Sequence, residues 1–208
     1  MFADRKEAGK KLAEKLAAYR GKSAVVLALP RGGVVLGYEV AKALKLPLDI
    51  IAVRKIGHPN DPEYAIGAVG EYGNPIMHEA EGAAIDQQWL SEETARQREE
   101  AQRRSRVYRG DKEAVNLEGK IAIIVDDGIA TGFTMRIAVR SIKAQKPGKI
   151  VVAVPVAPPD SLRLLKEEGA DEIIVLVPPE EFMGAVGAHY KQFEQVEDAE
   201  VIKLLRSV

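Results

Sequence analysis

The sequence has no cysteine, no excess of charge of either sign and no long apolar run. Without cysteine it cannot form disulfides, thiolate nucleophiles or cysteine-ligated metal sites. The 30 basic and 31 acidic residues balance, which argues against a general attraction to nucleic acid or to an anionic membrane. No segment approaches the roughly 18 apolar residues of a membrane helix, and the charged N-terminus lacks the apolar core of a signal peptide. We therefore expect a soluble, cytoplasmic protein.

Short apolar runs alternate with segments of helical periodicity along the chain. The apolar runs cover residues 23–30, 48–53, 120–127, 149–156 and 171–177. The apolar residues within each run are continuous rather than alternating, which is typical of parallel strands covered on both faces. Apolar residues at helical spacing lie at 4–20, 36–44, 135–142 and 160–168. The 208 residues therefore predict one α/β domain: an open, doubly wound, mainly parallel five-stranded sheet flanked by helices. Ligands of such sheets bind at the carboxyl ends of the strands.

An insertion, residues 54–110, separates the two halves of this pattern. Its first part, 54–63, contains two prolines, a glycine and an Asn-Asp pair, which predict a mobile loop. Residues 64–78 have the pattern of a hairpin with its turn near 71–74. Residues 91–108 predict a polar helix. Glutamates interleave with its arginines four residues apart, which favours a solvated or subunit-packing helix over an RNA-binding one.

The segment AIIVDDGIATGFT, residues 122–134, has the strongest functional signal. Its apolar residues place Asp126 and Asp127 at the carboxyl end of a predicted strand, and a turn then leads into the next helix. Small residues in that turn let backbone amides approach a ligand, and Thr131 and Thr134 add hydroxyl donors. Helix-terminal amides favour a phosphate, whereas the carboxylates favour hydroxyl groups or a cation. A ribose 5-phosphate satisfies both requirements.

Other motifs fit these residues less well. A receiver domain also has an acidic pair after a strand, but it needs a phosphorylatable aspartate on a later strand, and no later strand ends in one. The glycine-rich segment 31–37 lacks the spacing of a dinucleotide fingerprint, and the Walker A sequence is absent. His58, His78 and His189 do not share the spacing of metal ligands, which argues against zinc. A strand-to-helix turn with incidental acids remains as an alternative.

The thirteen residues 122–134 resemble the signature of type I phosphoribosyltransferases, with four apolar residues, two acids and a small-residue turn. LPRGGV, residues 29–34, is similar to that family's pyrophosphate loop. Arg54-Lys55 resembles the basic pair of the catalytic loop in the orotate branch. Residues 177–190 resemble the closing segment of the hypoxanthine–guanine branch. The resemblance implies the same fold with a small C-terminal hood, here 178–208.

The resemblance also implies binding of 5-phosphoribosyl 1-pyrophosphate together with Mg²⁺. Asp126 and Asp127 would face the ribose hydroxyls and hold the metal through those hydroxyls or through water. The turn that would hold the 5′-phosphate consists of Gly128, Ile129, Ala130, Thr131, Gly132, Phe133 and Thr134.

The pyrophosphate would lie on a second loop. That loop consists of Pro30, Arg31, Gly32 and Gly33, and the family has a non-proline cis peptide at the position of Pro30–Arg31. The residues expected to close on the leaving group as catalytic residues are Arg54, Lys55 and His58. The orotate-type loop has a lysine where His58 stands, which leaves that role open.

The implied activity is transfer of the phosphoribosyl group to a small nitrogenous acceptor, expected to be a nucleobase, with release of pyrophosphate. The candidate acceptor residues are Val177, Glu180 and Phe182. The hypoxanthine–guanine branch reads its base with a lysine and an aromatic residue, and neither is present in 151–160 or 171–180. The alternative is a non-catalytic regulator of the same fold that senses phosphoribosyl pyrophosphate or a nucleotide, and a non-catalytic partner subunit also stays open. We expect a homo-oligomer without a membrane or nucleic-acid partner.

Overall fold

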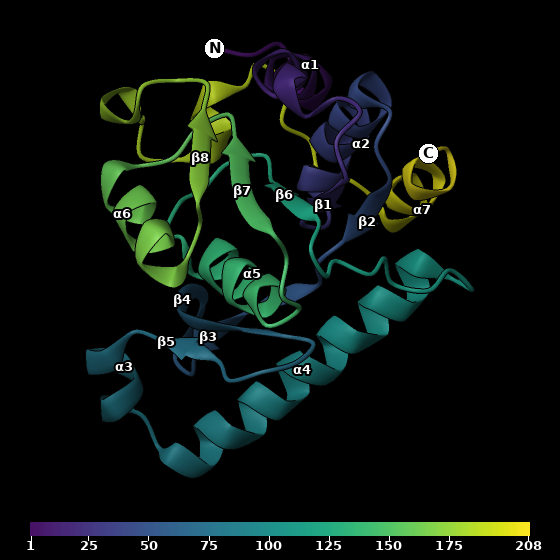
Figure 1. Ribbon diagram of the computed structural model, residues 1–208. Helices are drawn as coiled ribbons and strands as arrows, with labels where there is room; N and C mark the ends of the chain where they lie inside the picture. The colour runs from purple at the N-terminus through teal and green to yellow at the C-terminus, as the bar shows by residue number, and fades with distance from the viewer.

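The computed structural model describes residues 1–208, apart from the side chains of Glu63 and Glu79. Its centre is a parallel five-stranded sheet in the order β2-β1-β6-β7-β8 (Figure 1). The strands are β1 (Ala24–Ala28), β2 (Leu48–Ile50), β6 (Ile121–Val125), β7 (Lys149–Val154) and β8 (Glu172–Val175). Each of them lies inside one of the apolar runs, so the predicted parallel sheet is confirmed.

Alternate residues of the central strands belong to two cores, one on each face of the sheet. The covering helices are α1 (Arg5–Lys15), α2 (Gly32–Leu44), α5 (Phe133–Lys143) and α6 (Pro159–Glu168). Val26 and Ile123 pack with α1 and α2, whereas Val25 and Ile124 pack with α5 and α6. Every residue of β1 is buried because both faces are covered, which explains its continuously apolar sequence. The doubly wound arrangement is therefore confirmed.

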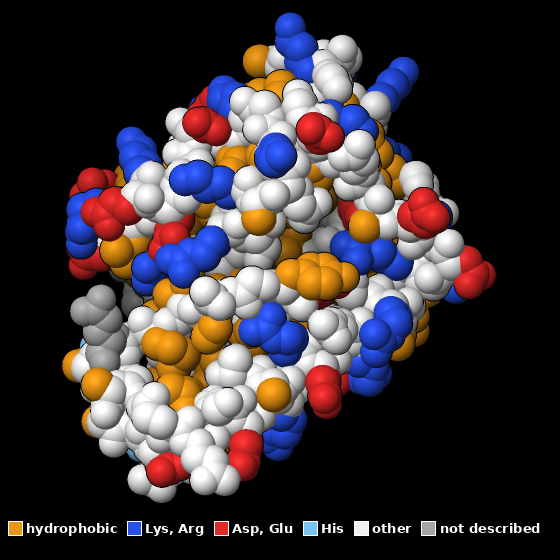
Figure 2. All heavy atoms as spheres, turned by 60° about the horizontal axis from the view of Figure 1, so that its bottom comes forward, with side chains coloured by type: hydrophobic (Ala, Val, Ile, Leu, Met, Phe, Trp, Pro, Cys, Tyr) orange, Lys and Arg blue, Asp and Glu red, His pale blue; other side chains and the backbone are white. Residues whose placement is uncertain are grey.

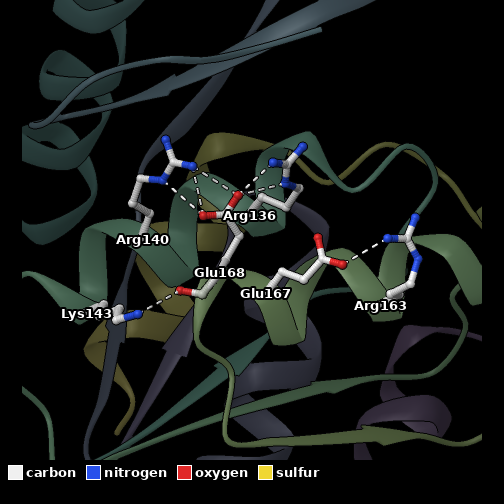
Figure 3. A network of polar contacts seen from close by, with 6 residues as sticks. All are labelled: Arg136, Arg140, Lys143, Arg163, Glu167 and Glu168. Carbon is white, nitrogen blue, oxygen red and sulfur yellow. Dashed lines mark hydrogen bonds and ion pairs between the residues drawn. The ribbon is translucent and has the colours of Figure 1, made fainter. Parts of the chain in front are cut away.

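An ion-pair network fixes α5 against α6 on the second face (Figure 3). Glu168 at the end of α6 lies 2.7 Å from a terminal nitrogen of Arg136 and 2.8 Å from one of Arg140. Burial alone would raise the pKa of Glu168, but hydrogen bonds from Arg140 and Arg136 outweigh it and lower the pKa. These contacts hold the helix whose N-terminus borders the turn after Asp127.

The N-terminal helix ends earlier than its pattern predicts. It stops at Lys15, and a single 3₁₀ turn, Ala17–Tyr19, follows. Before the helix, the backbone N–H of Phe2 donates to the carbonyl of His189 at 2.7 Å. This pairing ties the N-terminus to the C-terminal segment. Arg5 thereby lies at the carboxyl end of β6, where its side chain donates to Asp127.

The first part of the insertion is a second, antiparallel sheet. Its strands are β3 (Val53–His58), β4 (Asp61–Gly70) and β5 (Ile76–Met77), in that order. The prediction of a loop over 54–63 is therefore wrong in its secondary structure, whereas the hairpin predicted within 64–78 is confirmed by the pairing of β4 with β5. The range 54–63 includes Glu63, whose side chain lies outside the described part of the chain.

Burial explains why strands form here in spite of the prolines. Ile56 and Ile66 are fully buried and pack with Trp89 of the following helix. Pro59 lies in the turn between β3 and β4. Pro62 lies where the register of the two strands shifts, so neither proline has to donate to a regular ladder. The mobility of this hairpin stays a prediction.

The remaining helices are α3 (Glu79–Ala84), α4 (Gln87–Arg109) and α7 (Asp198–Arg206), with 3₁₀ turns at Pro179–Glu181 and Val186–His189. The predicted polar helix is confirmed as α4, the long helix at the bottom of Figure 1. Val201 and Leu205 of α7 pack with Val34 and Tyr108, which joins α7 to α2 and α4. In the described part of the chain, no helix is long and apolar enough to cross a membrane. The hood role of 178–208 stays a prediction.

Candidate active site

Asp126 and Asp127 leave the carboxyl end of β6 side by side and half-buried. The backbone N–H of Asp127 donates to Oδ1 of Asp126 at 2.8 Å. Burial raises the pKa of Asp126 well above its ordinary value, and the neighbouring charge of Asp127 adds to the effect. Burial also raises the pKa of Asp127, although Arg5 opposes it. A cation or hydroxyl donors would favour the ionised form of both groups, which matches the predicted chemistry.

The turn after the acid pair borders a cavity of ≈ 190 Å³. Its lining residues are Asp126, Gly128, Ile129, Ala130, Thr131, Gly132, Thr134, Met135 and Val186. Gly132, the N-cap of α5, has a left-handed φ of 81°, and the Ser161 hydroxyl donates to the carbonyl of Ala130 at 3.1 Å. Unpaired amides and the helix dipole at this end of α5 favour an anion. Of the predicted turn residues, Phe133 alone points elsewhere, toward Ile137 and the second sheet.

The loop after β1 touches both acids because it contains two glycines. A Cβ on Gly32 would lie 2.0 Å from Oδ2 of Asp127, and one on Gly33 would lie 2.8 Å from Oδ1 of Asp126. Both distances are far below van der Waals contact, so a larger residue would push the loop and the acids apart. The peptide bond Pro30–Arg31 is cis, as the resemblance implies. The structure therefore brings the predicted pyrophosphate loop, the acid pair and the predicted phosphate turn together.

The side chain of Arg31 points toward α7. Its guanidinium lies 3.6 Å from Oδ1 of Asp198, and the Tyr108 hydroxyl donates to that same oxygen at 2.6 Å. Burial, and then the hydrogen bond to Asp198, raise the pKa of Tyr108 to about 12. The loop thus presents backbone amides to the candidate site, whereas the Arg31 guanidinium pairs with Asp198.

The basic residues of the insertion lie on the second sheet. Arg54 donates from Nε to Oε1 of Gln97 on α4 at 3.1 Å, and burial, followed by repulsion from nearby Arg104, lowers the pKa of Arg54. Lys55 follows it on β3. His58 lies at the end of β3, where its Nδ1 accepts the backbone N–H of Asn60 at 3.2 Å. None of the three predicted residues, Arg54, Lys55 and His58, lines the 190 Å³ cavity.

The predicted acceptor residues follow β8. The backbone N–H of Val177 donates to the carbonyl of Pro155 at 3.0 Å, and Glu180 is exposed in a 3₁₀ turn. Phe182 stacks on buried His189 with ring centroids 5.6 Å apart. These three residues do not line the cavity, whereas Val186, further along the same segment, does. Val186 is therefore a site-wall residue that sequence reasoning missed.

Arg5 and Tyr190 bond to Asp127, and Phe193 packs on Arg5; the sequence predicts none of these contacts. Nε of Arg5 donates to Oδ2 of Asp127 at 2.8 Å, and the Tyr190 hydroxyl donates to the Asp127 carbonyl at 2.6 Å. The ring of Phe193 lies 3.8 Å from the guanidinium of Arg5. Burial, and then the charge of Asp127, raise the pKa of Tyr190. These contacts join residues 122 and 63 positions apart, so no local spacing in the sequence could indicate them.

Asp126 and Asp127 are the candidate ligands for Mg²⁺. Among the residues that the structure describes, no three or more His, Cys, Asp or Glu side chains form a metal-binding group. Mg²⁺ commonly takes one or two carboxylates and completes its shell with water and substrate oxygens. Two adjacent carboxylates beside a cavity fit such a partial ligand set, so these residues would hold Mg²⁺ only together with a substrate.

Comparison with known proteins gives a family match over most of the chain. The family model of the phosphoribosyl transferase domain matches residues 3–175. Two curated proteins of Mycobacterium tuberculosis, MT0597 and Rv0571c, provisionally named phosphoribosyl transferases, are each 42% identical over 207 residues. The match covers 99% of this chain and 46% of theirs, so the chain spans about half the length of these relatives.

Solved structures agree with this match. The crystal structure of TT1426 from Thermus thermophilus is 42% identical, with a TM-score of 0.80 over 99% of this chain and 98% of that one. The AQ2163 protein of Aquifex aeolicus is 16% identical, with a TM-score of 0.53 over 83% of this chain and 72% of that one. The second likeness shows a shared fold alone.

Proposed function

Because this chain belongs to the phosphoribosyl transferase family, we propose that it is a magnesium-dependent enzyme acting on 5-phosphoribosyl 1-pyrophosphate. It transfers the phosphoribosyl group to a small nitrogenous acceptor, expected to be a nucleobase, and releases pyrophosphate. One observation carries the proposal: the acid pair, the cavity at the N-terminus of α5 and the glycine loop meet at one place. The substrate has in one molecule the hydroxyls, the phosphate and the pyrophosphate that these three features suit.

Each part of the substrate has a matching element of the chain. The 5′-phosphate lies in the 190 Å³ cavity, where the amides of residues 130–134 and the hydroxyls of Thr131 and Thr134 donate to it. The ribose hydroxyls donate to Asp126 and Asp127. The pyrophosphate accepts from the first amides of α2, at Gly32 and Gly33.

The reaction breaks the bond between ribose C1′ and a pyrophosphate oxygen and forms a bond from C1′ to the acceptor nitrogen, which then loses a proton to solvent. Positive charge develops on the ribose, and negative charge grows on pyrophosphate. Asp126 and Asp127 stabilise the first charge, and the amides of Gly32 and Gly33 stabilise the second. Bound Mg²⁺ would supply further positive charge to the leaving pyrophosphate.

Arg54, Lys55 and His58 have their proposed role only after the β3–β4 hairpin changes position. Arg54 is bonded to Gln97 of α4, and none of the three borders the cavity. Closure of such a segment would exclude water and so prevent hydrolysis of the substrate. Support for this step comes from the sequence resemblance of Arg54-Lys55.

The position of Arg54, bonded to Gln97 and away from the cavity, favours a second candidate function. A sensor of phosphoribosyl pyrophosphate needs the cavity and the acid pair but can leave the basic residues away from the substrate, as Arg54 is placed here. Such a protein would bind the ligand reversibly without turning it over. The two functions therefore differ in chemistry at C1′ and agree in ligand binding.

One experiment separates the two. The protein is incubated with phosphoribosyl pyrophosphate, Mg²⁺ and a panel of nucleobases, and pyrophosphate release is followed, with a chelator as control. We expect release with at least one base and none with the chelator. Ligand binding by calorimetry without release would support the sensor, and absence of both binding and release would refute the family site assignment.

Assembly and location belong to the same proposal. Figure 2 turns the second sheet and α4 toward the viewer and shows hydrophobic side chains exposed between charged ones. Exposed Tyr64 and Tyr72, on and beside β4, suit contact with a second copy of the chain. The homo-oligomer and the cytoplasmic location stay predictions, to be checked by light scattering and by localisation of the whole protein.

A further inference from the structure

Arg5 makes several contacts beside the acid pair although it comes from the N-terminal helix. Its side chain is 12% exposed, with Nε 2.8 Å from Oδ2 of Asp127. One terminal nitrogen, Nη1, donates to the carbonyl of Glu194 at 2.7 Å, and the guanidinium lies 3.8 Å from the centroid of the Phe193 ring. Three contacts from two segments therefore fix the position of this cation.

The Arg5 side chain lies against the loop after β1. A Cβ on Gly32 would lie 2.8 Å from Nε of Arg5 and 2.0 Å from Oδ2 of Asp127. Gly32 is the first residue of α2, so its backbone N–H is among those without an intrahelical partner. The guanidinium and the first amides of α2 thus border the same space, while Arg31 of that loop points to Asp198.

The hydrogen-bonding capacity of Arg5 is only partly used. Among the described contacts, Nε and Nη1 donate, and Nη2 makes no hydrogen bond. A guanidinium presents five N–H donors in a planar fork that suits phosphate oxygens. Asp127 supplies one negative charge, whereas pyrophosphate brings several and accepts from more than one donor at once.

We propose that Arg5 is a pyrophosphate-binding residue of this site, which donates from its free nitrogen to the pyrophosphate of the substrate. The inference rests on the proposed function, since it adds a residue to that same site. It assigns to α1 the positive side chain that the loop does not supply through Arg31.

The test compares two probes on native protein and on variants. Calorimetry measures the affinity for inorganic pyrophosphate with Mg²⁺ and, separately, for ribose 5-phosphate. In Arg5→Gln we expect the pyrophosphate affinity to fall by about 10- to 150-fold, the range of a lost charged hydrogen bond. The ribose 5-phosphate affinity should change much less, because its phosphate lies at α5. Lys6→Gln, which removes one charge from an exposed position of the same helix, should behave as native.

Arg5→Lys guards against a failure of folding, checked by circular dichroism. Lysine keeps the charge but not the planar fork, so an intermediate loss confined to pyrophosphate is expected. If the affinities for pyrophosphate and for ribose 5-phosphate fall equally in the Arg5 variants, Arg5 only joins the N-terminal and C-terminal segments, and the inference is wrong. An unchanged pyrophosphate affinity would also overturn it. Both results leave the proposed function intact if native protein binds phosphoribosyl pyrophosphate. If native protein binds neither probe nor phosphoribosyl pyrophosphate, the proposed function fails and the role of Arg5 fails with it.

Discussion

Gly32→Ala is a one-methyl perturbation of the contact between the loop after β1 and the acid pair. The new Cβ would lie 2.0 Å from Oδ2 of Asp127 and 2.8 Å from Nε of Arg5. Both neighbours are ends of side chains, so they can move, but moving them separates the loop from Asp127. Overpacking of this kind costs about 1–3 kcal/mol. If that cost raises the free energy of the ligand-bound state, the affinity for phosphoribosyl pyrophosphate with Mg²⁺ falls by about 5- to 150-fold.

Calorimetry and thermal unfolding together test this reasoning. Gly82→Ala in α3 is the control, because its Cβ would meet its nearest neighbour at an ordinary 3.4 Å. Gly33→Ala is the informative contrast: its Cβ would lie 2.9 Å from the carbonyl oxygen of Val125, which is backbone and cannot step aside. We expect Gly33→Ala to lower the unfolding temperature more than Gly32→Ala does. Native-like affinity in Gly32→Ala, at unchanged stability, would refute the contact between loop and acids as the binding arrangement.

Four further outcomes follow from the site and its surroundings. Replacing both acids, Asp126→Asn with Asp127→Asn, should lower Mg²⁺-dependent ligand affinity or turnover by orders of magnitude; an unchanged double variant would contradict the site. Tyr108→Phe removes a donor to the Asp198 carboxylate and should cost about 1–1.5 kcal/mol in chemical unfolding. The folded pKa of Tyr108 is raised from 10.0 to about 12, so its contribution is fully present below pH 10 and is lost as pH rises to 12. The native protein should therefore lose more stability between pH 10 and pH 12 than Tyr108→Phe does. Hydrogen exchange at 55–63 should slow when ligand binds if the hairpin closes, and equal protection would exclude a lid. Hypoxanthine and guanine should be poor acceptors in steady-state assays, because no lysine or aromatic residue follows β7 or β8 at the positions expected for them; micromolar Michaelis constants would show the opposite.

The fold could be predicted from the sequence because its main signal is local and repeated. Each apolar run is as long as a buried strand, and most are followed by a turn and a helix-periodic segment. Asp126 and Asp127 could be assigned for the same reason, since both acids and the turn after them occupy one contiguous segment. Gly32 and Gly33 become candidates through the resemblance of residues 29–34 to the family's pyrophosphate loop, and their role in binding pyrophosphate stays a prediction.

The insertion shows where local signals fail. Pro59 and Pro62 predict a loop, but proline excludes a strand only where an N–H must join a ladder, and a turn and a register shift supply positions where it need not. The deciding factor is the burial of Ile56 and Ile66 beneath Trp89, a contact between segments more than 20 residues apart. Contacts between such distant segments produce no hydrophobic periodicity that could be recognised within a short segment of the sequence.

The candidate site also extends beyond the residues that the family model matches. The family model matches residues 3–175, yet Val186 lines the cavity, Tyr190 bonds to Asp127, and Phe193 supports the Arg5 guanidinium. Residues after 175 therefore wall a candidate site whose acid pair and predicted phosphate turn come from earlier segments. Within this C-terminal segment, Glu180 and Phe182 do not border the cavity, so they can vary with little effect on the acid pair or the turn. For this reason we expect the determinants of the acceptor to lie after β8, and substitutions at Glu180 or Phe182 to change which base is used in the nucleobase-panel assay more than they change phosphoribosyl pyrophosphate binding.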